Sequence, residues 1–248
     1  MVDASLTVGG LLGVLLSAGF VYAEVGRFAA PQVAQSRFDE RKEIFAYTAG
    51  LFAGVPAAVP MVFYLEALTN AALLAALIDL VLVVAAVESA SWVLVRSKYF
   101  GRVPATTFYV LGLRAGSAGI LILTVVARFA QSASLDPGGI AVALLQSLAI
   151  LAALVTAGML SLPSRILSGG TGSPWAGALY LAVSMGLVGT PMLFGTVLGL
   201  VGCSIALLGS LFLYQSRLRP LLRRVGVPAG TPETGPPLAS ERGFRRRT

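Results

Sequence analysis

The chain has 248 residues, of which 56% are hydrophobic and only 12% charged, and its formal net charge is +7. A mean hydropathy of +0.85 excludes an ordinary water-soluble domain, and several apolar stretches approach the ~20 residues needed to cross a bilayer. The basic residues lie in loops and in the tail, so the charge does not indicate nucleic-acid binding. The composition predicts a multi-pass protein of the cell membrane, surrounded by the lipid bilayer.

Seven apolar stretches follow one another along the chain. Because a segment in lipid must satisfy its own backbone hydrogen bonds, each is expected to be a helix. The predicted spans are residues 6–23, 44–65, 71–95, 105–127, 140–162, 175–193 and 196–214. A sharp reversal near Gly195, or at Gly189-Thr190-Pro191, must separate the last two, since one helix would far exceed the bilayer. The predicted fold is an all-α bundle of seven transmembrane helices over residues 1–226, with a disordered basic tail over 227–248.

The basic residues are unevenly distributed between the two sides of this bundle. Of the 18 Lys and Arg residues, all except Arg114 and Arg128 fall in the first, third and fifth loops or in the tail. Cytoplasmic loops of membrane proteins are enriched in Lys and Arg. The N-terminus is therefore predicted to lie outside and the C-terminus in the cytoplasm.

The residue inventory also bears on metal and cofactor sites. The chain has no histidine and a single cysteine, Cys203, within an apolar run. Haem with histidine ligands, copper sites, zinc sites built on histidine, iron–sulfur clusters and disulfides all need more of these residues. We expect no metal site, no covalently bound cofactor and no catalytic centre, and we expect Cys203 to be a buried apolar side chain.

Three ionisable residues lie inside the predicted spans, where an unpaired charge costs about 3 kcal/mol or more. Glu88 in the third span and Arg114 in the fourth lie at similar depths, given a rise of 1.5 Å per residue. They are predicted to form an ion pair that clamps two helices together. Asp79 lies nine residues from Glu88 and so on about the opposite helix face. It is expected either to be protonated and hydrogen-bonded, or to line a proton path or polar ligand pocket.

Glycines recur at helical spacing on several spans. Small residues let transmembrane helices approach closely, so we expect these positions to serve packing. They are Gly9, Gly10 and Gly13, then Gly112, Gly116 and Gly119, and finally Gly195, Gly199 and Gly202.

The corner between the first two spans, within residues 20–54, gathers charges of both signs. Glu24 and Arg27 lie one helical turn apart at the end of the first span. The cluster that opens the second span comprises Arg37, Asp39, Glu40, Arg41, Lys42 and Glu43. A cytoplasmic turn explains basic residues but not the acidic ones. This corner is therefore expected to be a contact surface, unless Glu24 and Arg27 form only an i,i+3 pair with nothing bound.

This corner resembles the membrane-anchor subunits of dimethyl sulfoxide reductase-type molybdoenzymes, in the polysulfide-reductase anchor superfamily. These carry H-L-G-x-P at the end of one span and S-x-x-L-S-[RN]-E-[IV] at the start of the next, often followed by L-F-x-G. The corresponding segments are EVGRF at 24–28, SRFDERKEI at 36–44 and LFAG at 51–54. Further similar segments are SASW at 89–92, KYFGR at 98–102, TTF at 106–108, LRAG at 113–116 and LLGSLFLY at 207–214. The chain departs from the family in having Glu24 for its histidine and no proline after Arg27, and in lacking its first span.

The resemblance implies an anchor that binds quinol or quinone and passes electrons to an iron–sulfur subunit, in a complex with a molybdopterin subunit. Glu24, Gly26 and Arg27 would form the quinone site, with Glu24 as proton acceptor and Arg27 orienting it or bonding a quinone oxygen. The residues that would contact the partner subunit are Arg37, Arg41, Lys42 and Glu43. The main alternative is a small proton-coupled secondary transporter that uses Asp79, Glu88 and Arg114 as its polar path. A membrane scaffold without a ligand is a third reading.

Overall fold

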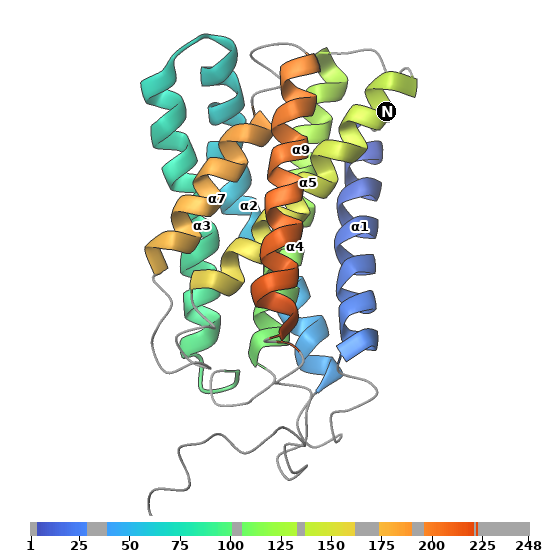
Figure 1. Ribbon diagram of the computed structural model, residues 1–248, viewed down its shortest axis with the longest axis vertical. Coiled ribbons are helices and arrows are strands. Elements are labelled where there is room, and N and C mark those ends of the chain that lie inside the picture. Colours follow the sequence, from blue (N-terminus) through green and yellow to red (C-terminus); the bar gives the residue numbers. More distant parts are fainter. Residues whose placement is uncertain are drawn as a thin grey trace, which may run out of the picture.

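The computed structural model describes residues 4–28, 39–100, 106–132, 137–161, 174–189, 196–220 and 222. Over these residues the chain forms helices and turns and no β-strand, which confirms the predicted all-α class. The helices are α1 (Ala4–Phe28), α2 (Glu40–Thr69), α3 (Leu73–Arg96), α4 (Thr106–Ser132), α5 (Pro137–Ser161), α7 (Pro174–Gly189) and α9 (Thr196–Leu213). The last continues into a π-helix, η1 (Tyr214–Leu218). The helices run up and down as a bundle (Figure 1).

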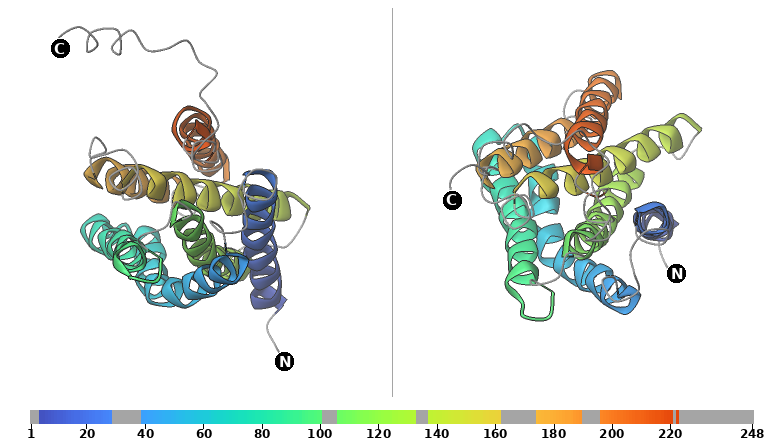
Figure 2. Two further views of the ribbon diagram at one scale, coloured as in Figure 1. Left: turned by 90° about the horizontal axis from the view of Figure 1, so that it is seen from below. Right: turned by 60° about the horizontal axis from the view of Figure 1, so that its bottom comes forward.

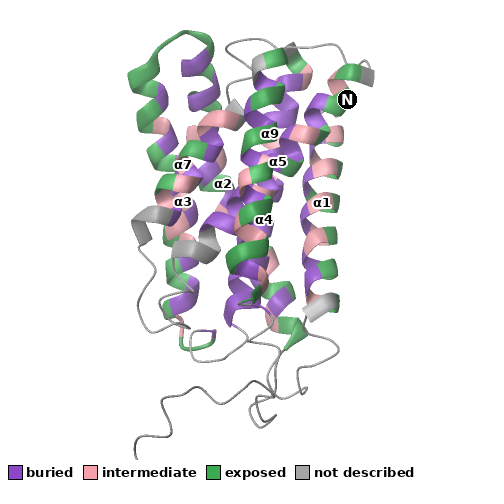
Figure 3. Ribbon diagram, viewed as in Figure 1, coloured by how far each residue is buried: buried purple, intermediate pink, exposed green. Residues whose placement is uncertain are grey.

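Six of the helices are long and apolar enough to cross a membrane, and α7 contributes a shorter apolar segment, Gly177–Leu187. Large hydrophobic residues are exposed on the outer faces of the bundle, and Figure 3 shows exposed positions along α1, α3 and α9. Such faces suit contact with lipid acyl chains. The structure therefore supports a multi-pass membrane protein, while the count of seven spans and the orientation of the termini stay predictions. The predicted tail at 227–248 and the predicted reversal at 190–195 lie outside the described residues.

The helix α2 begins one turn before the apolar span predicted from the sequence. Asp39 is its N-cap, and a side-chain oxygen of Asp39 accepts a hydrogen bond from the backbone N–H of Arg41 at 3.0 Å. Glu40 and Glu43 lie in the first turn, where negative charge complements the helix dipole. The acidic–basic cluster is thus partly helical, and Glu43 lies on the buried face of α2.

The helix α4 lies at the centre of the bundle. All of its residues from Thr106 to Gly119 are buried, and it packs against α1, α2, α3 and α5. Seen from the lower end, α1 and α2 lie on neighbouring sides of α4 (Figure 2).

Glycines permit this close packing around α4. A Cβ on Gly50 of α2 would collide with the backbone carbonyl of Leu113, and a Cβ on Gly116 of α4 would collide with that of Tyr47. A Cβ on Gly13 of α1 would meet the carbonyl of Gly119. The packing role predicted for Gly13, Gly116 and Gly119 is confirmed.

Candidate functional site

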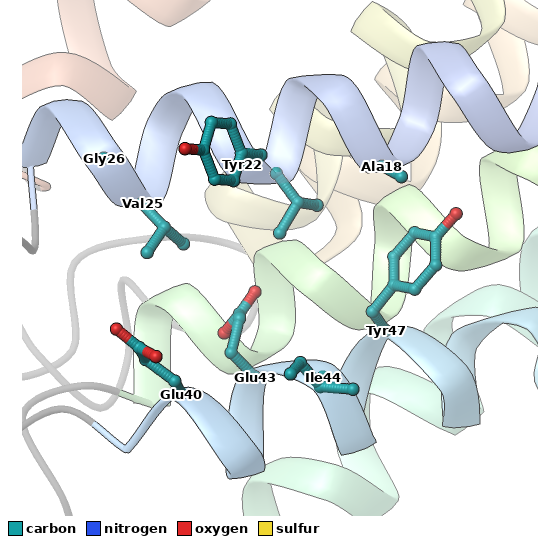
Figure 4. A pocket seen from close by; sticks show the side chains of 9 residues that line it. Ala18, Tyr22, Val25, Gly26, Glu40, Glu43, Ile44 and Tyr47 are labelled. Carbon is teal, nitrogen blue, oxygen red and sulfur yellow. The ribbon is translucent and has the colours of Figure 1, made fainter.

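A pocket of about 530 Å³ lies between the lower part of α1 and the first two turns of α2 (Figure 4). Its lining residues are Ala18, Val21, Tyr22, Val25 and Gly26 on α1, and Glu40, Glu43, Ile44 and Tyr47 on α2. All except Ala18 fall within residues 20–54, the stretch in which the sequence gathers mixed charges. The walls are mainly apolar, and the two carboxylates stand one helical turn apart on the α2 side.

Glu43 is the distinctive residue of this pocket. Its side chain is 4% exposed and extends from α2 toward α1 (Figure 4). Neither carboxylate oxygen has a hydrogen-bond partner among the described residues. Buried polar groups normally have one, and leaving a buried carboxylate without one costs several kcal/mol. The pocket therefore presents a strong hydrogen-bond acceptor that a ligand could satisfy.

A hydroxyl pair joins the two walls at the inner end of the pocket. The hydroxyls of Tyr47 on α2 and Ser17 on α1 are 2.9 Å apart, and the Ser17 hydroxyl also donates to the carbonyl of Gly13 at 2.6 Å. Because α1 and α2 each pack mainly on α4, this pair fixes the spacing between them at that level.

Glu24 was predicted as the proton acceptor. It is buried on a different face of α1 from the lining residues and does not line the pocket. Its two carboxylate oxygens accept from the hydroxyl of Tyr214 in η1, at 2.9 and 3.0 Å. This contact ties the lower end of α1 to η1. Gly26 does line the pocket, and Arg27 belongs to α1, with its side chain outside the described part of the structure.

The residues predicted to contact a partner subunit are found in three environments. Arg37 lies outside the described residues, and Arg41 is exposed. Lys42 is half-buried, with its Nζ donating to the carbonyl of Tyr99 at 3.3 Å and lying 4.3 Å from the centre of the Tyr99 ring. Glu43 faces the pocket, so its carboxylate is not part of the outer surface that Arg41 presents.

The predicted ion pair between Glu88 and Arg114 is confirmed. Nη2 of Arg114 lies 2.8 Å from a carboxylate oxygen of Glu88, and Nη1 donates to the carbonyl of Leu154 on α5 at 3.4 Å. Arg114 is fully buried, so its guanidinium joins α3, α4 and α5. Asp79 is half-buried in the first half of α3 and forms no ion pair with another described residue.

Cys203 is buried, as predicted. Within the described ranges, no group of three or more His, Cys, Asp or Glu residues is placed to hold a metal ion.

Comparison with known proteins gives no match to a protein family, to a curated protein or to a solved structure. The resemblance to the anchor superfamily therefore rests on the sequence motifs.

Proposed function

We propose that the protein is the membrane-anchor subunit of a respiratory oxidoreductase and that its substrate, a quinol, binds in the pocket between α1 and α2. The observation that carries this proposal is the buried carboxylate of Glu43. It faces an otherwise largely apolar pocket and has no hydrogen-bond partner in the described part of the chain. A quinol combines a hydroxyl-bearing ring with an apolar tail. The hydroxyl would donate to Glu43, and the valine and tyrosine side chains would contact the ring and tail.

Oxidation of a quinol releases two protons and two electrons, so the site needs a proton acceptor. Glu43 is placed to take a proton from a hydroxyl bound in the pocket. Glu40 is the first residue of α2 and is exposed, so it can pass the first proton on to water and leave Glu43 ready to take the second. We assign to Glu43 the acceptor role that the motif comparison suggested for Glu24, since the carboxylate of Glu24 is engaged by Tyr214.

The electrons would pass to an iron–sulfur subunit docked at the same end of the bundle, in a complex that includes a molybdopterin subunit. The exposed basic side chains Arg41, Arg96 and Lys98 lie at this end, and they suit an acidic partner surface. The positive-inside rule puts this end in the cytoplasm.

The test is the substitution Glu43→Gln in the complex purified from membranes. We expect quinol-dependent reduction of the iron–sulfur subunit to fall at least tenfold, because the amide cannot take up the proton. Glu66→Gln is the matched control, since Glu66 is an exposed glutamate at the opposite end of the same helix. Unchanged reduction by the Glu43→Gln complex, with all subunits retained, would contradict the proposal.

A further inference from the structure

The pocket between α1 and α2 has an unbalanced charge. Glu40 and Glu43 both line it, and no lysine or arginine is among the described residues that line it. Neither glutamate forms an ion pair with a described residue. The nearest lysine in sequence, Lys42, is directed to the carbonyl and ring of Tyr99. A buried carboxylate without a counter-charge is unfavourable, and a positively charged ligand would supply that charge.

The remaining lining suits a cation that is also apolar. The side chains of Val21, Val25 and Ile44 offer aliphatic contacts, and the rings of Tyr22 and Tyr47 face the same space (Figure 4). Aromatic rings attract cations through their π faces. A volume of about 530 Å³ lies within the range of pockets that hold small organic molecules. Tyr22 is 83% exposed and Ile44 is 66% exposed, so the rim of the pocket is open to the surroundings of the bundle.

We propose that this pocket binds lipophilic organic cations, with Glu43 as the counter-charge and the tyrosine rings as cation–π partners. The inference concerns the same pocket as the proposed quinol site, but it does not depend on quinol chemistry. A neutral quinol satisfies the hydrogen bonding of Glu43 and leaves its charge uncompensated, whereas an organic cation compensates the charge. Lipophilic cations should therefore also compete with quinol for the pocket.

The experiment uses two probes of the same shape and opposite charge, tetraphenylphosphonium and tetraphenylborate. Binding to the full-length protein in neutral detergent micelles is measured by equilibrium dialysis. We expect saturable, one-site binding of the phosphonium and at least tenfold weaker binding of the borate. Equal binding of the two ions would overturn the proposal, because it would show partition into an apolar surface without a counter-charge.

Substitutions of the glutamates test whether Glu43 is the counter-charge of the bound cation. Glu43→Gln should weaken phosphonium binding at least tenfold, Glu43→Asp should retain most of it, and Glu66→Gln should leave it unchanged. Binding that is the same in the wild type and in a folded Glu43→Gln variant would also overturn the proposal. If Glu43→Gln fails to fold, Glu40→Gln, which alters the exposed member of the pair, should still weaken binding severalfold, and no effect there would count against the proposal.

Different results would contradict the quinol site and the cation site. Phosphonium binding that a short-chain quinol does not displace would support the cation site and count against the quinol site. Quinol-dependent reduction that requires Glu43, without any phosphonium binding, would do the reverse.

Discussion

Gly112 on α4 has no side chain, and this determines where the carboxylate of Glu43 can lie. Gly112 packs directly behind that side chain, and a Cβ at Gly112 would collide with Oε1 of Glu43 and lie 3.0 Å from its carboxyl carbon. The notch left by the glycine therefore accommodates the buried carboxylate. Gly112 was predicted only as a packing residue, and the structure shows that it packs against the side chain of Glu43.

Gly112→Ala should therefore destabilise the protein by about 1–3 kcal/mol, because the added methyl group overpacks the contact with Glu43. The measurement is unfolding in mixed detergent micelles. Gly10→Ala is the control, since its Cβ would meet only a side-chain atom of Leu123 at 3.9 Å. Adding Glu43→Ala to Gly112→Ala should remove the clash, so the effects of the two substitutions should not add. Strict additivity would show that Gly112 does not determine the position of Glu43.

The spacing of small and apolar residues along α2 indicates that Glu43 lies on the buried face of the helix. Buried positions on α2 include Glu43, Ala46, Gly50 and Gly54, at intervals of three and four residues. This is the repeat of one helix face. The sequence-based boundary began the span at Ile44, the first residue of the apolar run, and so placed Glu43 with the surface charges. Capping by Asp39 extends the helix by one turn and moves Glu43 inside. No residue spacing could predict the contact of Glu24 with Tyr214, because the two residues are 190 positions apart in the sequence.

At the scale of whole helices, the apolar stretches predicted each α-helix in the described part of the chain to within about five residues at each end. Length and hydropathy suffice for this, because a single apolar segment in lipid can satisfy its own backbone hydrogen bonds only as a helix. Which helices touch could not be predicted in the same way. The exception is the pair of charges in α3 and α4, since two opposite charges at equal depth in an apolar bundle are stable only together.

Arg114→Met should destabilise the bundle by about 3–5 kcal/mol, because it breaks the buried ion pair of Arg114 with the carboxylate of Glu88. The double variant Glu88→Met/Arg114→Met should recover most of that loss, since it removes both charges and retains apolar packing. Unfolding in mixed micelles measures both variants. A double variant no more stable than Arg114→Met alone would show that the guanidinium acts through other contacts, such as the one with the Leu154 carbonyl.

For the molecule as a whole, the two ends of the bundle differ in charge. The lower end in Figure 1 includes the start of α2 and the end of α3, where the described basic residues Arg41, Lys42, Arg96 and Lys98 lie. At this end cations also pack on aromatic rings, with Arg96 over Trp92 at 3.4 Å. Such an arrangement is typical of a membrane–water interface.

Cysteine labelling tests the predicted orientation. In a Cys203→Ala background, Asn70→Cys in the α2–α3 turn should react with a membrane-impermeant maleimide in intact cells. Lys98→Cys, which follows α3, should react only after permeabilisation. Both residues are exposed, so differences in burial do not confound the comparison. The reverse pattern would place the pocket, and any docked partner, on the outer side.

The hydrogen bond between Tyr214 and Glu24 also has a consequence for biosynthesis. The first helix enters the membrane early, but the residue that secures its lower end leaves the ribosome 190 residues later. The hydrogen bond that holds the lower end of α1, one wall of the pocket, can therefore form only after η1 has been made. A nascent chain interrupted before Tyr214 would insert most of its helices and still lack a finished binding surface.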